Sequence, residues 1–136
     1  MRIRAILLAL SFAVLASPAF AQQTAPNPPL TGDAWYEAQL VDLANELGGA
    51  HYLRIRCQGN NDQRWRDYML GVINREPRFH DELVENFNRG YRDQEARYPQ
   101  CDTTAQQAEA ELRARGLRIS SGLSARHSTT PHQTGH

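Results

Sequence analysis

The residues of this chain with the clearest chemistry are its two cysteines, Cys57 and Cys101, which lie far apart in the sequence. An even number of cysteines in an exported chain is typical of a disulfide. Free thiols, a redox pair or half of a metal site are the alternatives, although the spacing is not that of a C-x-x-C motif. A bridge closing a loop of this length would stabilise the fold by about 4 kcal/mol through chain entropy. If the bridge forms, no cysteine remains to act as a nucleophile.

A second group of residues combines arginines with aromatic side chains. Arg89 and Arg92 are three positions apart, so on a helix they project from neighbouring positions. Arginine guanidinium groups bind carboxylates and phosphates through two hydrogen bonds. We therefore predict a binding surface for an envelope protein or an anionic ligand, made up of Arg54, Trp65, Arg66, Asn88, Arg89, Tyr91 and Arg92.

The same arginines also have a purely structural interpretation, which the sequence favours. Glu85 and Arg89 are four positions apart, a spacing at which ordinary surface ion pairs contribute about 0.2–0.5 kcal/mol each. Gly90 lies between the arginines of this segment and permits a close approach of either a ligand or another backbone. The two interpretations differ in whether the arginines converge on one concave surface or find acidic partners.

No catalytic residue, metal site or cofactor is predicted. The chain contains no HExxH motif, no GxSxG motif and no glycine-rich phosphate loop. All 15 basic residues are arginine, which excludes catalysis by a lysine Schiff base. We expect His51 to be a semi-buried, hydrogen-bonded residue rather than a metal ligand. The 15 basic and 15 acidic residues balance, which argues against a nucleic-acid partner.

The first 21 residues have the features of a secretory signal peptide. Arg2 and Arg4 precede an uncharged apolar run over 5–16, and small residues flank Phe20. The run is shorter than the roughly 20 residues that span a bilayer. We therefore expect cleavage after Ala21, a periplasmic location and no membrane insertion after cleavage.

The positions of apolar residues, prolines and glycines predict how the rest of the chain is organised. Residues 22–30 are rich in proline and predict an extended linker, and residues 124–136 predict a disordered tail. The folded domain, residues 31–123, is predicted to be all-α with four helices at about 33–57, 62–76, 80–98 and 103–123. Helix four would be capped by Thr103 or Thr104.

Three features leave alternatives open within these helices. Gly48 and Gly49 would either kink or end the first helix, because glycines in a helix interior cost about 1 kcal/mol each. The segment 53–57 alternates apolar and charged residues, as a strand also does. Gly116 marks a break that would divide the last helix.

Three segments occur in order along this chain: HYLRIRC (51–57), QRWRDYM (63–69) and FNRGYRDQEARYPQC (87–101). Together they resemble one family of small exported alphaproteobacterial proteins of uncharacterised function. The resemblance covers about residues 47–123 and implies that Cys57 pairs with Cys101. It supplies no catalytic residue. Together with the patterns above, it leads us to expect a structural or interaction module of the cell envelope. The alternatives are a binder of small anions or cell-wall fragments and, third, a hydrolase without a recognisable motif.

Overall fold

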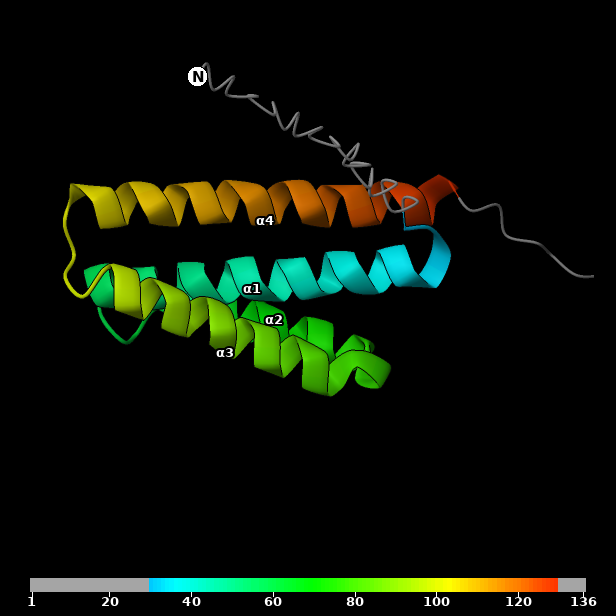
Figure 1. Ribbon diagram of the computed structural model, residues 1–136, viewed down its shortest axis with the longest axis horizontal. Helices are drawn as coiled ribbons and strands as arrows, with labels where there is room; N and C mark the ends of the chain where they lie inside the picture. Colours follow the sequence, from blue (N-terminus) through cyan, green and yellow to red (C-terminus); the bar gives the residue numbers. More distant parts are fainter. Residues whose placement is uncertain (1–29, 130–136) are drawn as a thin grey trace, which may run out of the picture.

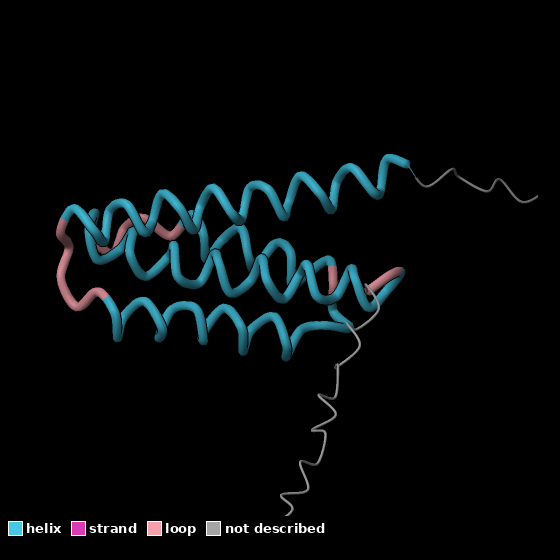
Figure 2. The backbone as a smooth tube through the Cα atoms, turned by 45° about the horizontal axis from the view of Figure 1, so that its top comes forward, coloured by secondary structure: helices cyan, strands magenta, loops and turns pink. Residues whose placement is uncertain are grey.

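The computed structural model describes residues 30–129 and contains four α-helices (Figures 1 and 2). They are α1 (Gly32–Gln58), α2 (Arg64–Arg75), α3 (His80–Arg97) and α4 (Thr103–Thr129), with a 3-10 turn (η1, Pro77–Phe79) before α3. This confirms the predicted all-α fold with four helices. The predicted signal peptide, residues 22–29 of the predicted linker and residues 130–136 of the predicted tail lie outside the described residues.

Helix α1 is the centre of the domain. The other three helices pack on it, α3 most extensively, then α4 and then α2, and they contact each other much less. Its buried positions run from Leu40 to Leu53 and lie on more than one side of the helix. Figure 1 shows α4 running alongside α1 on one side and α3 crossing along α1 on the other. A helix buried on several sides must be apolar or small around most of its circumference.

Two glycines allow α1 and α3 to touch through their backbones. A Cβ atom on Gly48 would overlap the carbonyl oxygen of Phe87, and one on Gly90 would overlap the carbonyl oxygen of Asn45. α1 does not end at the Gly48–Gly49 pair, since it is one continuous helix to Gln58. The strand considered for 53–57 is not formed. The backbone approach that Gly90 permits is that of α1, as the structural interpretation predicted.

The last helix differs from its prediction at both ends. Asp102, and not a threonine, caps α4: its Oδ1 accepts hydrogen bonds from the Ala105 N–H at 2.8 Å and from the Thr104 hydroxyl at 2.6 Å. The helix shows no break at Gly116 and continues beyond Leu123 to Thr129. The boundary predicted at 123/124 therefore falls inside a helix, where the Arg126 guanidinium stacks 3.8 Å from the centre of the Trp35 ring.

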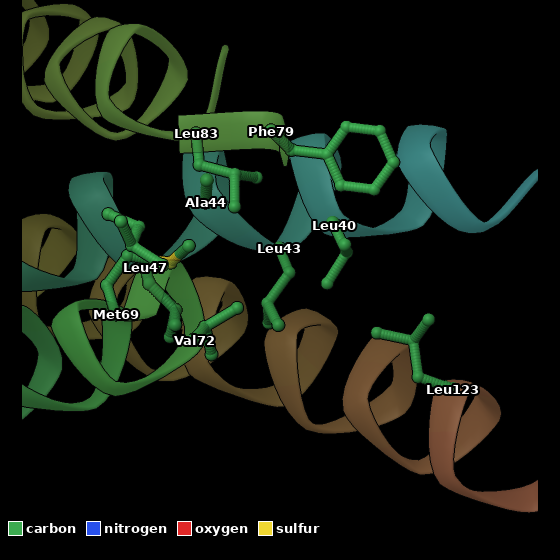
Figure 3. Packing of buried hydrophobic residues seen from close by; sticks show 10 residues of the cluster. Leu40, Leu43, Ala44, Leu47, Met69, Val72, Phe79, Leu83 and Leu123 are labelled. Atoms are coloured by element: carbon green, nitrogen blue, oxygen red, sulfur yellow. The ribbon is translucent and has the colours of Figure 1, made fainter. Parts of the chain in front are cut away.

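The buried apolar side chains form two clusters. The large cluster joins all four helices (Figure 3) and has ten buried members: Leu40, Leu43, Ala44, Leu47, Met69, Val72, Ile73, Phe79, Leu83 and Leu123. The small cluster lies near the C-terminal end of α1 and has five: Ala50, Tyr52, Leu53, Ala105 and Leu112. The small cluster contains only two leucines, so interactions other than aliphatic packing must contribute more to its stability than to that of the large cluster.

Candidate functional site

The two cysteines form a disulfide that closes the small cluster. Cys57 lies in the last turn of α1 and Cys101 lies just before α4, with their Cα atoms 5.1 Å apart. The predicted bridge is confirmed, and it accounts for both cysteines of the chain. Beside it, the Tyr52 hydroxyl donates a 2.8 Å hydrogen bond to the carbonyl oxygen of Tyr98. These contacts fix the end of α3 and the start of α4 against α1.

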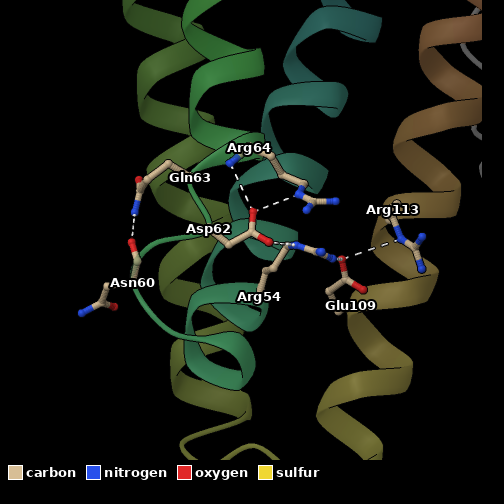
Figure 4. Close-up of polar contacts among 7 residues, drawn as sticks. All are labelled: Arg54, Asn60, Asp62, Gln63, Arg64, Glu109 and Arg113. Carbon is tan, nitrogen blue, oxygen red and sulfur yellow. Dashed lines mark hydrogen bonds and ion pairs between the residues drawn. The ribbon is translucent and has the colours of Figure 1, made fainter.

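Arg54, the first residue of the predicted binding surface, is the centre of an ion-pair network (Figure 4). Its Nε lies 2.6 Å from Asp62 Oδ2, and its terminal nitrogen lies 3.4 Å from Glu109 Oε1. Arg64 binds the other oxygen of Asp62 at 2.9 Å. The hydrogen bond from Arg54, followed by that from Arg64, holds the pKa of Asp62 below its ordinary value. Arg54 thus links α1, the loop before α2 and α4, and its charge is already compensated.

The two aromatic members of the predicted surface face inward. Trp65 packs against both clusters, and its buried indole N–H has no hydrogen-bond partner among residues 30–129. The Tyr91 ring meets the Tyr52 ring edge-on, with centroids 5.1 Å apart. Burial, and to a lesser extent the charge of Glu95, raises the pKa of Tyr91. Both aromatics therefore serve the packing of the domain.

The four remaining members, Arg66, Asn88, Arg89 and Arg92, are exposed on α2 and α3. Arg89 forms a 3.0 Å ion pair with Glu85, four residues earlier on the same helix. None of these four side chains lines the crevice described next. The seven residues are thus spread over a buried network, the core and the outer surface, and their role in binding remains a prediction.

Sequence reasoning missed a crevice between α2 and α4. It consists of two pockets in line, of about 300 Å³ and 330 Å³. Leu43, Tyr68 and Ser120 line both pockets. The first pocket is completed by Leu47, Trp65, Arg113, Gly116 and Leu117, and the second by Tyr36, Leu40, Val72, Arg75, Glu76, Leu123 and Ser124. We call these pockets the Trp65 pocket and the Val72 pocket.

The crevice exists because α2 and α4 pack on α1 rather than on each other. Gly116 contributes no side chain where α4 faces Leu47 and Leu43, whose methyl groups lie 3.5 and 3.7 Å from the position of a Cβ atom. A contact between the hydroxyls of Tyr68 and Ser120, 3.3 Å apart, crosses the crevice between the pockets. Leu117 on the rim is 68% exposed and Tyr68 is 44% exposed. Leu117 was the one residue in the sequence that could have indicated the crevice, since it is an apolar residue outside the apolar stripe of α4.

The crevice is lined by apolar side chains, hydroxyls, two guanidinium groups and one carboxylate. Residues 30–129 contain no group of three or more His, Cys, Asp or Glu side chains placed to hold a metal ion. In the same part, no helix has the length and apolar character required to cross a membrane. The lining of the Trp65 pocket contains hydroxyls and one guanidinium, but no carboxylate, imidazole or thiol.

Comparison with known protein families gives a match. A family model described as "Protein of unknown function (DUF2385)" matches residues 35–127. This range contains both cysteines and all of α1 except its first three residues. No curated protein and no solved structure matches the chain.

Proposed function

Since this chain belongs to the DUF2385 family, whose function is unknown, we propose a function from its own geometry: it is an exported interaction module of the bacterial cell envelope that binds a partner protein in the α2/α4 crevice. The proposal keeps the interaction role expected from the sequence. It moves the binding site from the arginine-rich surface to the crevice.

The export part of the proposal rests on the sequence and on the disulfide. Arg2, Arg4 and the apolar run 5–16 have the order of a signal peptide. Disulfides persist in oxidising compartments such as the bacterial periplasm and are rare in the cytosol. The Cys57–Cys101 bridge is in keeping with that compartment, and so is the resemblance to small exported alphaproteobacterial proteins.

The binding part of the proposal rests on one observation, the apolar crevice with exposed apolar side chains at its rim. Single exposed apolar residues are normal on any surface. Here exposed Tyr68 of α2 and exposed Leu117 of α4 line one pocket together with the buried Leu43 and Leu47. Pockets lined by apolar side chains with a few polar groups are preferred binding sites. A partner that fills the crevice would remove this apolar surface from water, at about 25 cal/mol per Å².

Site-specific photocrosslinking in cells of the native host tests the binding part. A photoreactive phenylalanine analogue replaces Leu117 at the rim of the crevice or, as the control, Arg92 on the exposed surface of α3. We expect position 117 to give an adduct with a defined protein that position 92 does not give. A Ser120→Phe substitution, which places a ring where the two pockets meet, should abolish the adduct, and Ser121→Phe on the adjacent exposed position should not. Absence of an adduct from position 117, or the same adduct from both positions, would refute the proposal.

The export part has its own test. The intact mass of the protein isolated from the native host without reductant should correspond to a chain that begins at Gln22 with both thiols oxidised. Fractionation should release it with the periplasmic contents. A full-length chain with alkylatable cysteines in the cytosolic fraction would contradict export.

A further inference from the structure

The two pockets of the crevice repeat with a constant spacing along the helices that form them. Trp65 in the first pocket corresponds to Val72 in the second on α2, and Gly116 corresponds to Leu123 on α4. Each pair is seven residues apart, which is about 10 Å along a helix at 1.5 Å per residue. The crevice therefore offers two apolar pockets about 10 Å apart and parallel to two helices.

This spacing selects a helix as the occupant. On a helix, side chains seven positions apart are about two turns apart, lie on the same face and are separated by about 10 Å. In an extended chain, side chains on one face are separated by about 7 Å or about 13 Å, because alternate residues point to opposite sides. The contact between Tyr68 and Ser120 narrows the crevice between the pockets, so the occupant must have small side chains there.

The charged groups at the crevice select the polar residues of the occupant. Arg113 lines the Trp65 pocket and Arg75 lines the Val72 pocket, so that there is a guanidinium in each. Arg113 has one distant ion pair, 3.7 Å from Glu109, and within residues 30–129 Arg75 forms none. The remaining charged group, Glu76, already accepts a 2.5 Å hydrogen bond from the Tyr36 hydroxyl. Both ends of the crevice are therefore suited to carboxylates.

The hydrogen bond from Tyr36 to Glu76 persists over the physiological pH range. Burial, together with the hydrogen bond to Glu76, raises the pKa of Tyr36 to about 12. The phenol therefore remains protonated and continues to donate its hydrogen bond. The hydrogen bond engages Glu76 but leaves its charge, so the charged groups that line the crevice, Arg113, Arg75 and Glu76, sum to one positive charge.

We propose that the α2/α4 crevice binds an amphipathic helix of the partner protein that places two large apolar side chains, seven residues apart, in the two pockets and carries acidic residues near both ends. This inference rests on the proposed function and specifies its ligand. The binding mode is that of an amphipathic helix in an apolar groove, in which anchors on one helical face enter the pockets.

A designed peptide tests the chemistry of the ligand without knowledge of the partner. The probe is a fluorescein-labelled, alanine-based helical peptide with leucines seven positions apart and glutamates at both ends. Binding to the full disulfide-bonded protein is measured by fluorescence anisotropy. We expect it to bind at least about tenfold more tightly than a peptide with its leucines five positions apart, whose side chains lie on different faces. We expect a similar preference over a peptide with lysines at the ends.

Two matched pairs of protein variants locate the binding. Ser120→Phe should weaken binding about tenfold or more because its ring blocks the crevice where the two pockets meet, and Ser121→Phe should leave binding unchanged. Arg113→Ala should weaken binding of the glutamate peptide several-fold and should change binding of the lysine peptide by less than that factor. Arg118→Ala, at an exposed position outside the lining, should have no effect on either peptide. In ¹⁵N-resolved NMR spectra, the peptide should shift the indole N–H signal of Trp65 more than that of Trp35.

The proposal is wrong if the two leucine spacings bind equally, if the lysine peptide binds better, or if Ser120→Phe leaves binding unchanged. It is also wrong if the protein forms a dimer that Ser120→Phe dissociates, because a second copy would then be the occupant. If crosslinking from position 117 succeeds and the peptide fails, the interaction function stands and the helical ligand is refuted. If crosslinking fails, the function itself is refuted.

Discussion

The small cluster near the disulfide and the large cluster beside the crevice solve the same packing problem with different means. The small cluster has two leucines and is held by Cys57–Cys101, by the Tyr52 hydrogen bond to Tyr98 and by the ion pairs of Arg54. The large cluster has five leucines and side chains from all four helices. Where aliphatic side chains are few, covalent and polar links fix the helices. Where they are abundant, packing suffices and even leaves a crevice at the surface.

The largest effect is expected from opening the disulfide. Cys57→Ser should lower the free energy of unfolding by about 4 kcal/mol, since the bridge spans 44 residues and restricts the unfolded chain accordingly. Urea denaturation followed by circular dichroism measures the loss. Cys101→Ser should give the same value, and the double variant should be no less stable than either single variant. Additive losses would show that the two sulfur atoms contribute separately, and the small cluster would then not be held by a disulfide.

The next largest effect is expected in the large cluster, from Leu83→Ala. Leu83 is fully buried, and truncation of a buried leucine costs about 2–5 kcal/mol. Leu117→Ala, at a position that is 68% exposed, is the control and should change stability by less than about 0.5 kcal/mol. Because the two clusters share no buried members, the losses from Leu83→Ala and Cys57→Ser should add in the double variant. A clear departure from additivity would mean that the clusters form one unit.

A smaller effect on stability is expected from replacing glycine by alanine, and its sign should differ between the contact of α1 with α3 and an open position on α4. Gly90→Ala should destabilise by about 1–3 kcal/mol, because its Cβ would overlap the backbone of α1 and force the helices apart. Gly122→Ala is the matched substitution in α4, where a Cβ meets nothing within 4 Å, and should stabilise by up to about 1 kcal/mol through helix propensity. Thermal denaturation of both variants measures the difference. Equal effects would contradict the close approach of the two backbones.

The sequence predicts the architecture better than it predicts the site, for a physical reason. The helical spacing of apolar residues and the cap and turn residues are local, so four helices and their approximate ends follow from them. The cysteine pair follows from compartment and count. The continuation of α1 through Gly48 and of α4 through Gly116 does not, because tertiary contacts with Phe87 and Leu47 outweigh the low helix propensity of glycine.

The candidate site depends on relations that a single sequence does not contain. Arg54 has the residue type of an anion ligand, but Asp62 and Glu109 neutralise it, and Glu109 is 55 positions away. The crevice is a space between α2 and α4, and it exists because both helices pack on α1. The spacing of Trp65 from Val72 and of Gly116 from Leu123 is visible in the sequence, but it acquires meaning only when the two helices are placed side by side.

His51 lies between the two clusters and should make the stability of their junction depend on pH. It is 5% exposed, its ring lies 5.7 Å from that of Phe87 and 6.1 Å from that of Tyr91, and its Nδ1 has no hydrogen-bond partner among residues 30–129. The sequence-based expectation of a hydrogen-bonded histidine is therefore not met at this nitrogen. Burial lowers the pKa of His51, and the charge of Arg66 lowers it further, against the opposing effect of Asp62.

The direction of the pH effect follows from proton linkage. The unfolded chain binds a proton at His51 near pH 6.5, and the folded chain binds it only at lower pH. Between these values the unfolded state holds more protons, so the free energy of unfolding falls as the pH falls below about 6.5. His51→Leu removes this dependence. Its stability relative to the unsubstituted protein should therefore rise as the pH is lowered from about 7.5 to about 5, measured by urea denaturation at each pH.

At the upper end of this range the titration contributes nothing, which makes this the smallest of the four effects near neutral pH. Asp62 and Asp102 also have lowered pKa values. Their contributions to the free energy of unfolding are lost only as the pH falls below the ordinary carboxyl value of 3.8, which lies outside the interval from about pH 7.5 to about pH 5. His80→Leu is the control, since His80 is exposed beside Asp81. If His51→Leu and His80→Leu change the pH profile equally, the proton acts on the surface and the junction of the two clusters is insensitive to pH. If only His51→Leu flattens the profile, protonation opposes the packing of α3 on α1, where the two clusters meet.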